Sequence, residues 1–282
     1  MRQVLTIARL TILEASRRKL LLALGILTLL VIVLSSWGFS RLTTMNNVTH
    51  AEVRLASSQL TILMAFMFSG VLALGSTLVA APSIASDIES GIALAILPRP
   101  IRRSQLLMGK WLGLALLVAL YAAASGLLEM FGIWIGTQYV PPNPIAAIVF
   151  VGAEGIVLMS LALLLSTRLA PMTGGVIALV LFFVAWIGGI ALAIGNVFDN
   201  GTIKGIGTAS RYLIPTDGLW HGAIFYLEPS EIIAAAKAAG RARVGNPFFA
   251  EAPLANGYIL WVAIWLGLVI VLANWSFAKR DL

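Results

Sequence analysis

Two acids that lie within long apolar runs, Glu129 and Glu154, are the residues best placed to do chemistry in this sequence. An ionisable side chain inside a membrane is costly, so it faces a protein interior or a wet cavity and marks a candidate functional site. One hypothesis is that both carboxyls bind protons or cations on a transport pathway. The alternative is a protonated or hydrogen-bonded structural glutamate near a helix end. The sequence leaves both interpretations open.

The motifs of several enzyme classes are absent. The sequence has no G-x-x-x-x-G-K-[ST] loop for nucleotide phosphates, no H-E-x-x-H zinc motif and no G-x-S-x-G nucleophile motif. It has no cysteine, and its two histidines, His50 and His221, have no neighbours at ligand spacing. We therefore expect no catalytic residue, no metal site and no cofactor in this chain. An intramembrane enzyme is a less favoured hypothesis for its function.

A polar stretch between two apolar runs, residues 86–110, is the second candidate site. Ser86 and Glu89 have the spacing of a capping box, which predicts a helix that begins at Ser86. Isoleucines then recur every four residues as one apolar stripe, and two prolines end the helix before a basic corner. One interpretation is a helix lying among lipid headgroups, and the other is a docking element for a soluble partner. The predicted docking residues are Ser86, Asp87, Ile88, Glu89, Gly91, Ile92, Ile96, Pro98, Arg99, Arg102 and Arg103.

Six apolar segments must position these residues. Hydrophobic residues make up 60% of the 282 residues and charged residues 11%, which indicates an integral membrane protein. Such segments need about 20 mostly apolar residues to span a bilayer as helices. The third of them is longer than that, so its start lies in the interface or the helix is tilted. We predict an all-α single transmembrane domain over residues 1–282, with spans near 20–38, 60–81, 106–136, 145–166, 174–195 and 257–277.

The distribution of cations predicts the orientation. Most of the 19 lysines and arginines fall on the side that holds both termini, so this side is expected to be cytoplasmic. The net charge of +7 is spread along membrane flanks, which favours anionic lipid headgroups over nucleic acid as partners. Residues 1–19 are amphipathic and are expected to lie on the inner leaflet as an elbow helix. Its cations are Arg2, Arg9, Arg17, Arg18 and Lys19.

Other segments are assigned by length and composition. Residues 86–104 form the cytoplasmic segment, and residues 196–256 form an external segment that is long enough to fold. Within it, residues 216–227 and 230–240 are predicted as short re-entrant or interfacial helices. Glycines at i and i+4, in 109–113 and 132–136, are typical of close contacts between membrane helices.

These features resemble the ABC-2-type permeases, the membrane subunits of one class of ABC transporters. The resemblance includes the basic amphipathic N-terminus, the six-span layout, and the runs IESG at 88–91, LPRPIRR at 97–103 and GK at 109–110. The run PTDGLW at 215–220 is also similar to permeases grouped with multicopper-enzyme maturation systems, a likeness that assigns no substrate.

The resemblance implies a multi-pass cell-membrane protein in a dimer of permeases, driven by two separate cytoplasmic ATPase subunits that bind ATP and magnesium. It further implies that residues 86–104 contain the coupling helix, that the N-terminal helix is the elbow, and that substrate moves along the dimer interface, with export as the expected direction. The alternatives are a self-sufficient proton- or ion-coupled transporter that uses Glu129 and Glu154, and a structural membrane scaffold. The substrate, and whether the dimer is homo- or heteromeric, stay open.

Overall fold

The chain is helical throughout the part that the structure describes. The structure is a computed structural model, and it describes residues 2–17, 19–42, 50–89, 102–239 and 246–280. All regular secondary structure in these ranges is α-helix. The predicted all-α class is therefore confirmed.

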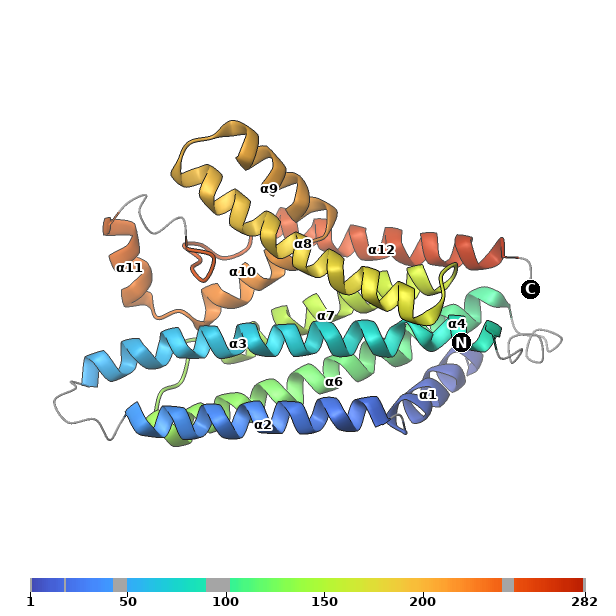
Figure 1. The fold of residues 1–282 in the computed structure, drawn as a ribbon, viewed down its shortest axis with the longest axis horizontal. Coiled ribbons are helices and arrows are strands. Elements are labelled where there is room, and N and C mark those ends of the chain that lie inside the picture. Colours follow the sequence, from blue (N-terminus) through green and yellow to red (C-terminus); the bar gives the residue numbers. More distant parts are fainter. Residues whose placement is uncertain (1, 18, 43–49, 90–101, 240–245, 281–282) are drawn as a thin grey trace.

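Six of the helices are long and apolar enough to cross a membrane. They lie side by side in one elongated bundle (Figure 1). The predicted number of spans is therefore confirmed. These helices are α2 (Lys19–Leu42), α3 (His50–Ala80), α6 (Arg103–Thr137), α7 (Pro144–Ser166), α8 (Pro171–Val197) and α12 (Asn256–Ala278).

Within the described residues, five shorter helices lie at the two ends of the bundle. Both ends of the chain lie at the same end of the bundle, as an even number of spans requires (Figure 1). We call this end the proximal end and the opposite one the distal end. The proximal helices are α1 (Arg2–Ser16) and α4 (Pro82–Glu89), and the distal helices are α9 (Gly201–Leu213), α10 (Thr216–Leu227) and α11 (Ser230–Ala239).

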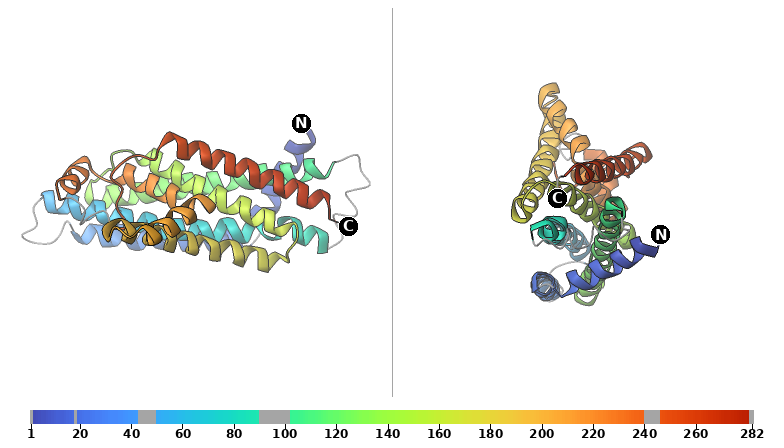
Figure 2. Two further views of the ribbon diagram at one scale, coloured as in Figure 1. Left: turned by 90° about the horizontal axis from the view of Figure 1, so that it is seen from above. Right: turned by 90° about the vertical axis from the view of Figure 1, so that its right-hand side faces the viewer.

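Helix α7 forms the centre of the bundle. It packs against α3, α6, α8, α10 and α12, because its apolar residues cover its whole circumference and no polar face turns it outward. Val157, Leu158 and Ala162 of this helix are completely buried. Helix α2 packs mainly against α3 and α6 among the described helices, and α8 and α9 lie on the side of the bundle away from α2 (Figures 1 and 2).

Helix α1 packs on two glycines of α6. Its buried residues Ala8, Thr11 and Ala15 form the inner face of the amphipathic helix that the sequence predicts. A side chain at Gly113 would lie 2.6 Å from the Ala8 carbonyl oxygen, and one at Gly109 would meet α1 in the same way. The glycine pair therefore lets the two backbones approach closely, as its spacing predicted.

Helix α9 was not predicted from the sequence. Its many glycines and its polar residues give it weak intrinsic helix propensity. The Asn200 side chain caps its first turn by accepting bonds from the backbone amides of Thr202 and Ile203, both at 3.1 Å. Gly207 lies against the Leu192 backbone of α8 with no room for a side chain. Packing against α8 therefore stabilises a helix that the sequence pattern alone does not favour.

The close contact between α1 and α6 predicts that Gly113→Val detaches α1. Overpacking of this kind costs about 1–3 kcal/mol. Because the chain has no cysteine, a single reporter at the buried position Ala15→Cys can be labelled with maleimide. We expect faster labelling in the Gly113→Val background and no change with Gly267→Val, whose added side chain would point into open space. Equal labelling rates in the two backgrounds would contradict this packing role.

Candidate functional site

Helix α4 begins the segment in which we predicted a docking helix, but its start was predicted wrongly. The helix begins at Pro82, and Ser86 lies inside it rather than capping it. The Ser86 hydroxyl donates to the Pro82 carbonyl within the same helix. Proline suits a first helical position, because its missing amide would have no partner there and its φ angle is already helical. Pro82 is thus the signal that the capping-box interpretation missed.

A buried ion pair ties α4 to α6. Lys110, a residue of α6 that is 5% exposed, donates its ammonium to the Asp87 carboxylate and to the Ser83 carbonyl. The lysine thus compensates the charge of Asp87 and also satisfies a backbone acceptor of α4. A buried charge without such a partner would be strongly destabilising, so α4 is held to the start of α6.

A second tether joins the start of α6 to the end of α12. The Arg103 guanidinium donates to the carbonyl oxygens of Ala278, at 3.0 Å, and Arg280, at 2.8 Å. The last carbonyls of a helix lack partners within the helix, and a cation near them also interacts favourably with the helix dipole. Its neighbour Arg102 is exposed, and the Arg102 backbone amide donates to the Gln105 side chain at 3.0 Å.

The connection between α7 and α8 is attached to the same end of α12. Arg168 donates from Nε to the Ser276 hydroxyl at 3.0 Å and from a terminal nitrogen to the Ser276 carbonyl at 3.1 Å. In return, Arg280 donates to the Thr167 carbonyl at 2.6 Å, and the Thr167 and Ser276 hydroxyls share a bond of 2.7 Å. Three proximal segments, the start of α6, the α7–α8 connection and the end of α12, therefore form one polar network.

The structure places only some of the predicted docking residues. Asp87 and Arg103 anchor neighbouring elements, Ser86 and Ile88 are half-buried on α4, and Arg102 is exposed. The sequence analysis did not assign the anchoring roles of Lys110 and Arg168, although a lysine inside the start of an apolar span is a visible signal. Gly91, Ile92, Ile96, Pro98 and Arg99 lie outside the described residues, as does the side chain of Glu89.

Exposed cations of the elbow segment also lie toward the proximal end. Arg2, Arg9 and Arg17 are exposed on or just after α1, and Lys19 is exposed at the first turn of α2. Arg18 lies outside the described residues. The proximal end therefore presents several exposed cations around α1, while Lys110, Arg103 and Arg168 hold helices together.

The two intramembrane acids have different surroundings. Glu154 of α7 is 2% exposed and accepts a hydrogen bond of 2.8 Å from the Ser69 hydroxyl of α3. Glu129 of α6 is 3% exposed, and its Oε1 has no hydrogen-bond partner among the described residues. Gly155 packs against Val118 in the antiparallel pair of α7 and α6, so roughly 15 Å of helix length separates the two acids. They do not form a shared carboxylate pair.

The hydrogen bonds and ion pairs described for the proximal end join one helix to another. No group of three or more histidine, aspartate or glutamate side chains in these ranges could hold a metal ion. A bundle of six spanning helices with polar tethers at one end is the architecture of a multi-pass membrane protein.

Comparison with known proteins gives the family. The sequence model of the ABC-2 family transporter proteins matches residues 5–282, so the chain belongs to this family. The chain is similar to the probable ABC transporter permease protein NosY of Pseudomonas aeruginosa, with 28% identity over 296 residues that cover 99% of each chain. The resemblance seen in the sequence is thus confirmed. The chain is an ABC transporter permease subunit and a multi-pass protein of the cell membrane.

The tether between α4 and α6 predicts that Lys110→Met lowers stability by about 3–5 kcal/mol, because Asp87 loses its buried partner. The double variant Lys110→Met/Asp87→Leu is expected to recover most of this loss, because it removes both charges. The thermal midpoint of the detergent-purified protein measures both effects. Lys204→Met, at an exposed lysine of α9, is the matched control. A Lys110→Met midpoint equal to that of the control would contradict the tether.

Proposed function

We propose that this permease is driven by two separate cytoplasmic ATPase subunits that dock at its proximal end. ATP and magnesium bind to those subunits in this proposal. The observation that carries it is the buried contact between Lys110 and Asp87, which ties the predicted docking segment to a spanning helix. A force applied to the docking segment therefore has a direct path into the membrane.

The polar network offers a route for that force. Residues 90–101 connect α4 to α6, and both helices are joined again by Lys110 and Asp87. Arg103 then links the start of α6 to the end of α12. In our proposal, a movement of the ATPase displaces α4, α6 and α12 together and alternates the access of the substrate pathway.

The orientation in this proposal follows from the cations. Arg2, Arg9, Arg17 and Lys19 are exposed around α1 and the start of α2, at the same end as the docking segment. Lysine and arginine are enriched in cytoplasmic segments of membrane proteins. This supports a cytoplasmic proximal end, with α1 as an elbow helix against the inner leaflet.

The pathway in this proposal lies between two permeases and carries substrate outward. Helix α2 turns a broad apolar face away from the bundle, where Leu22, Ile26 and Val33 are more than half exposed. Lipid and a second permease both fit such a face. Membership of the family favours a second permease copy or a paralogue as a partner, and export as the direction.

Docking at the proximal end predicts that charge reversal there releases the ATPase. We expect a tagged chain, extracted from its native membranes in mild detergent, to recover a phosphate-loop ATPase in a roughly equal amount. Arg102→Glu, at an exposed proximal cation, is expected to reduce this recovery about tenfold, which corresponds to losing about 1.4 kcal/mol of binding free energy. Ile92→Glu, at the centre of the predicted apolar stripe, is expected to do the same.

The same charge reversal at the distal end is the control. Lys204 is also exposed, and Lys204→Glu is expected to leave recovery unchanged. Equal recovery with Arg102→Glu, Ile92→Glu and Lys204→Glu would refute the docking surface. A folded chain that recovers no ATPase at all would refute the driven-permease proposal itself.

A second candidate function is a proton- or ion-coupled transporter that needs no ATPase. The observation that favours it is the Glu129 Oε1, which has no hydrogen-bond partner among the described residues. Purified chain in vesicles with an internal pH dye separates the two candidates. The driven-permease proposal predicts no proton flux in response to an imposed pH gradient, in unaltered protein and in Glu129→Gln alike. Proton flux that Glu129→Gln abolishes would favour the second candidate.

Glu154 has a structural role if the driven-permease proposal holds. Glu154→Gln keeps an oxygen that can accept from Ser69, so we expect thermal stability close to that of the unaltered protein. Glu154→Leu leaves the Ser69 hydroxyl without this acceptor and is expected to cost about 1–3 kcal/mol. Loss of transport in a stable Glu154→Gln protein would show that the ionisable group itself is needed.

A further inference from the structure

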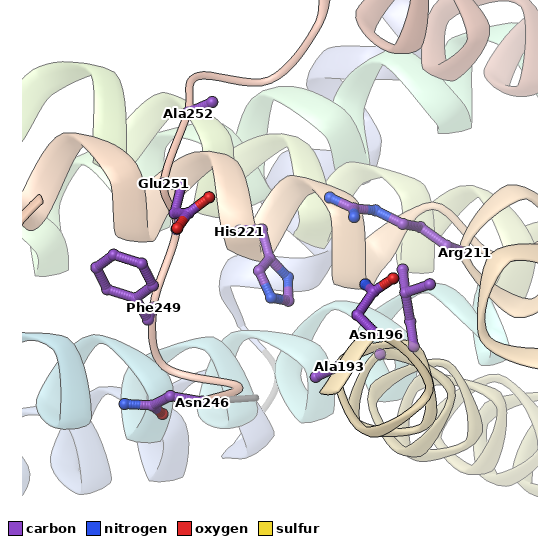
Figure 3. Close-up of a pocket in the computed structure, with 11 residues that line it drawn as sticks. Ala193, Asn196, Arg211, His221, Asn246, Phe249, Glu251 and Ala252 are labelled. Atoms are coloured by element: carbon purple, nitrogen blue, oxygen red, sulfur yellow. The ribbon is translucent and has the colours of Figure 1, made fainter. Parts of the chain in front are cut away.

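A polar cavity of about 200 Å³ opens at the distal end of the bundle. Arg211 of α9, His221 of α10 and Asn196 of α8 lie on one side of it, and Glu251 lies on the segment that leads to α12 (Figure 3). Arg211 and His221 also line an adjoining hollow of about 330 Å³. Nothing in the driven-permease proposal uses these side chains.

A buried acid orients the two basic side chains. Asp217 is 3% exposed, with its carboxylate 3.9 Å from Arg211 Nε and 3.5 Å from His221 Nδ1. Gly189 makes room for it, because any side chain there would collide with the carboxylate. Burial raises the pKa of the Asp217 carboxyl above its ordinary value, while His221 and Arg211 act to lower it. Asp217 therefore lies behind the two basic side chains and does not itself line the cavity.

The basic side chains keep donor and acceptor capacity for a ligand. The Arg211 Nε is buried beside Asp217, 3.9 Å from its carboxylate, so the terminal nitrogens of the guanidinium are the donors that can reach a ligand. The His221 Nδ1 lies 2.9 Å from the Asp217 carbonyl oxygen, so Nδ1 is the nitrogen engaged with α10 and Nε2 is left for another partner. In Figure 3 the guanidinium of Arg211 extends in the direction of the His221 ring.

The charges around the cavity favour a zwitterion over a simple anion. Arg211 can bind an anionic oxygen, but Asp217 and the exposed Glu251 would repel a ligand with only negative charge. A ligand that also carries an ammonium group can place it toward Glu251. Asn196 and Asn246 add neutral amide groups to the cavity lining.

Aromatic side chains near the cavity are of the kind found at the level of lipid headgroups. The indole groups of Trp261 and Trp265 donate to the carbonyl oxygens of Tyr212, at 3.0 Å, and Leu213, at 2.8 Å. Tryptophan and tyrosine concentrate where lipid tails meet headgroups. The adjoining hollow is lined partly by apolar groups, including Leu254, so it suits the less polar part of a lipid.

We propose that this cavity binds a zwitterionic phosphate headgroup of the ethanolamine phosphate type, with the phosphate at Arg211 and the ammonium toward Glu251. The site goes beyond the driven-permease proposal and does not depend on it, because binding needs no ATPase. The same chemistry can come from phosphatidylethanolamine in the membrane or from a free aminoalkyl phosphate.

Native mass spectrometry of delipidated protein tests the lipid source. With equal amounts of phosphatidylethanolamine and phosphatidylglycerol added, we expect the unaltered chain to retain the zwitterionic lipid preferentially. Arg211→Gln and Glu251→Gln are each expected to reduce that retention about tenfold, since each removes a charged hydrogen-bonding partner. Lys204→Gln, on α9 but outside the cavity lining, is the matched control and is expected to change nothing.

Thermal shift with free phosphoethanolamine tests the soluble source. A rise in the melting temperature that Glu251→Gln removes supports a soluble ligand, and lipid retention without such a rise supports the headgroup. Glu251 is exposed on a connecting segment, so this variant reports on the site even if Arg211→Gln fails to fold. Equal retention of both lipids without a thermal shift, or variants that behave like Lys204→Gln in both assays, would overturn the proposal.

Discussion

Close approach of helix backbones is the constraint on which the rest of this structure depends. Lipid tails are as apolar as the side chains they cover, so helices in a membrane gain little from burying apolar surface against one another. They associate through dense packing, and glycine provides it by letting backbones touch. Gly109 and Gly113 seat α1 on α6, and Gly207 seats α9 on α8. These contacts fix the positions of the helix ends, where the polar side chains lie.

Polar tethers then determine how the proximal end can move. Lys110 and Asp87 connect α4 to α6, Arg103 connects α6 to α12, and Arg168 connects the α7–α8 turn to α12. Each arginine bonds carbonyls at the end of a helix, where the backbone has unsatisfied acceptors. The proximal end is therefore cross-linked between segments that are distant in sequence.

The distal end has a different organisation. There the chain does not return directly into the bilayer after α8 but folds through three short helices before α12. The indole groups of α12 bond the last carbonyls of α9, and Asp217 lies between Arg211 and His221. Short helices held by specific polar contacts leave hollows that long parallel helices would close, which is why the cavities lined by Arg211 lie at this end.

The sequence by itself determined the fold class, the number of spans and the family, because hydropathy and span length depend on the local chain alone. It also indicated the buried stripe of α1 and the short helix α10. Only the tertiary structure decided that α4 starts at Pro82, that α9 is helical, and that Lys110 bonds Asp87. These features arise from contacts between residues far apart in the chain or from competing local signals. A one-dimensional pattern records which residues can make such contacts, but not which of them meet.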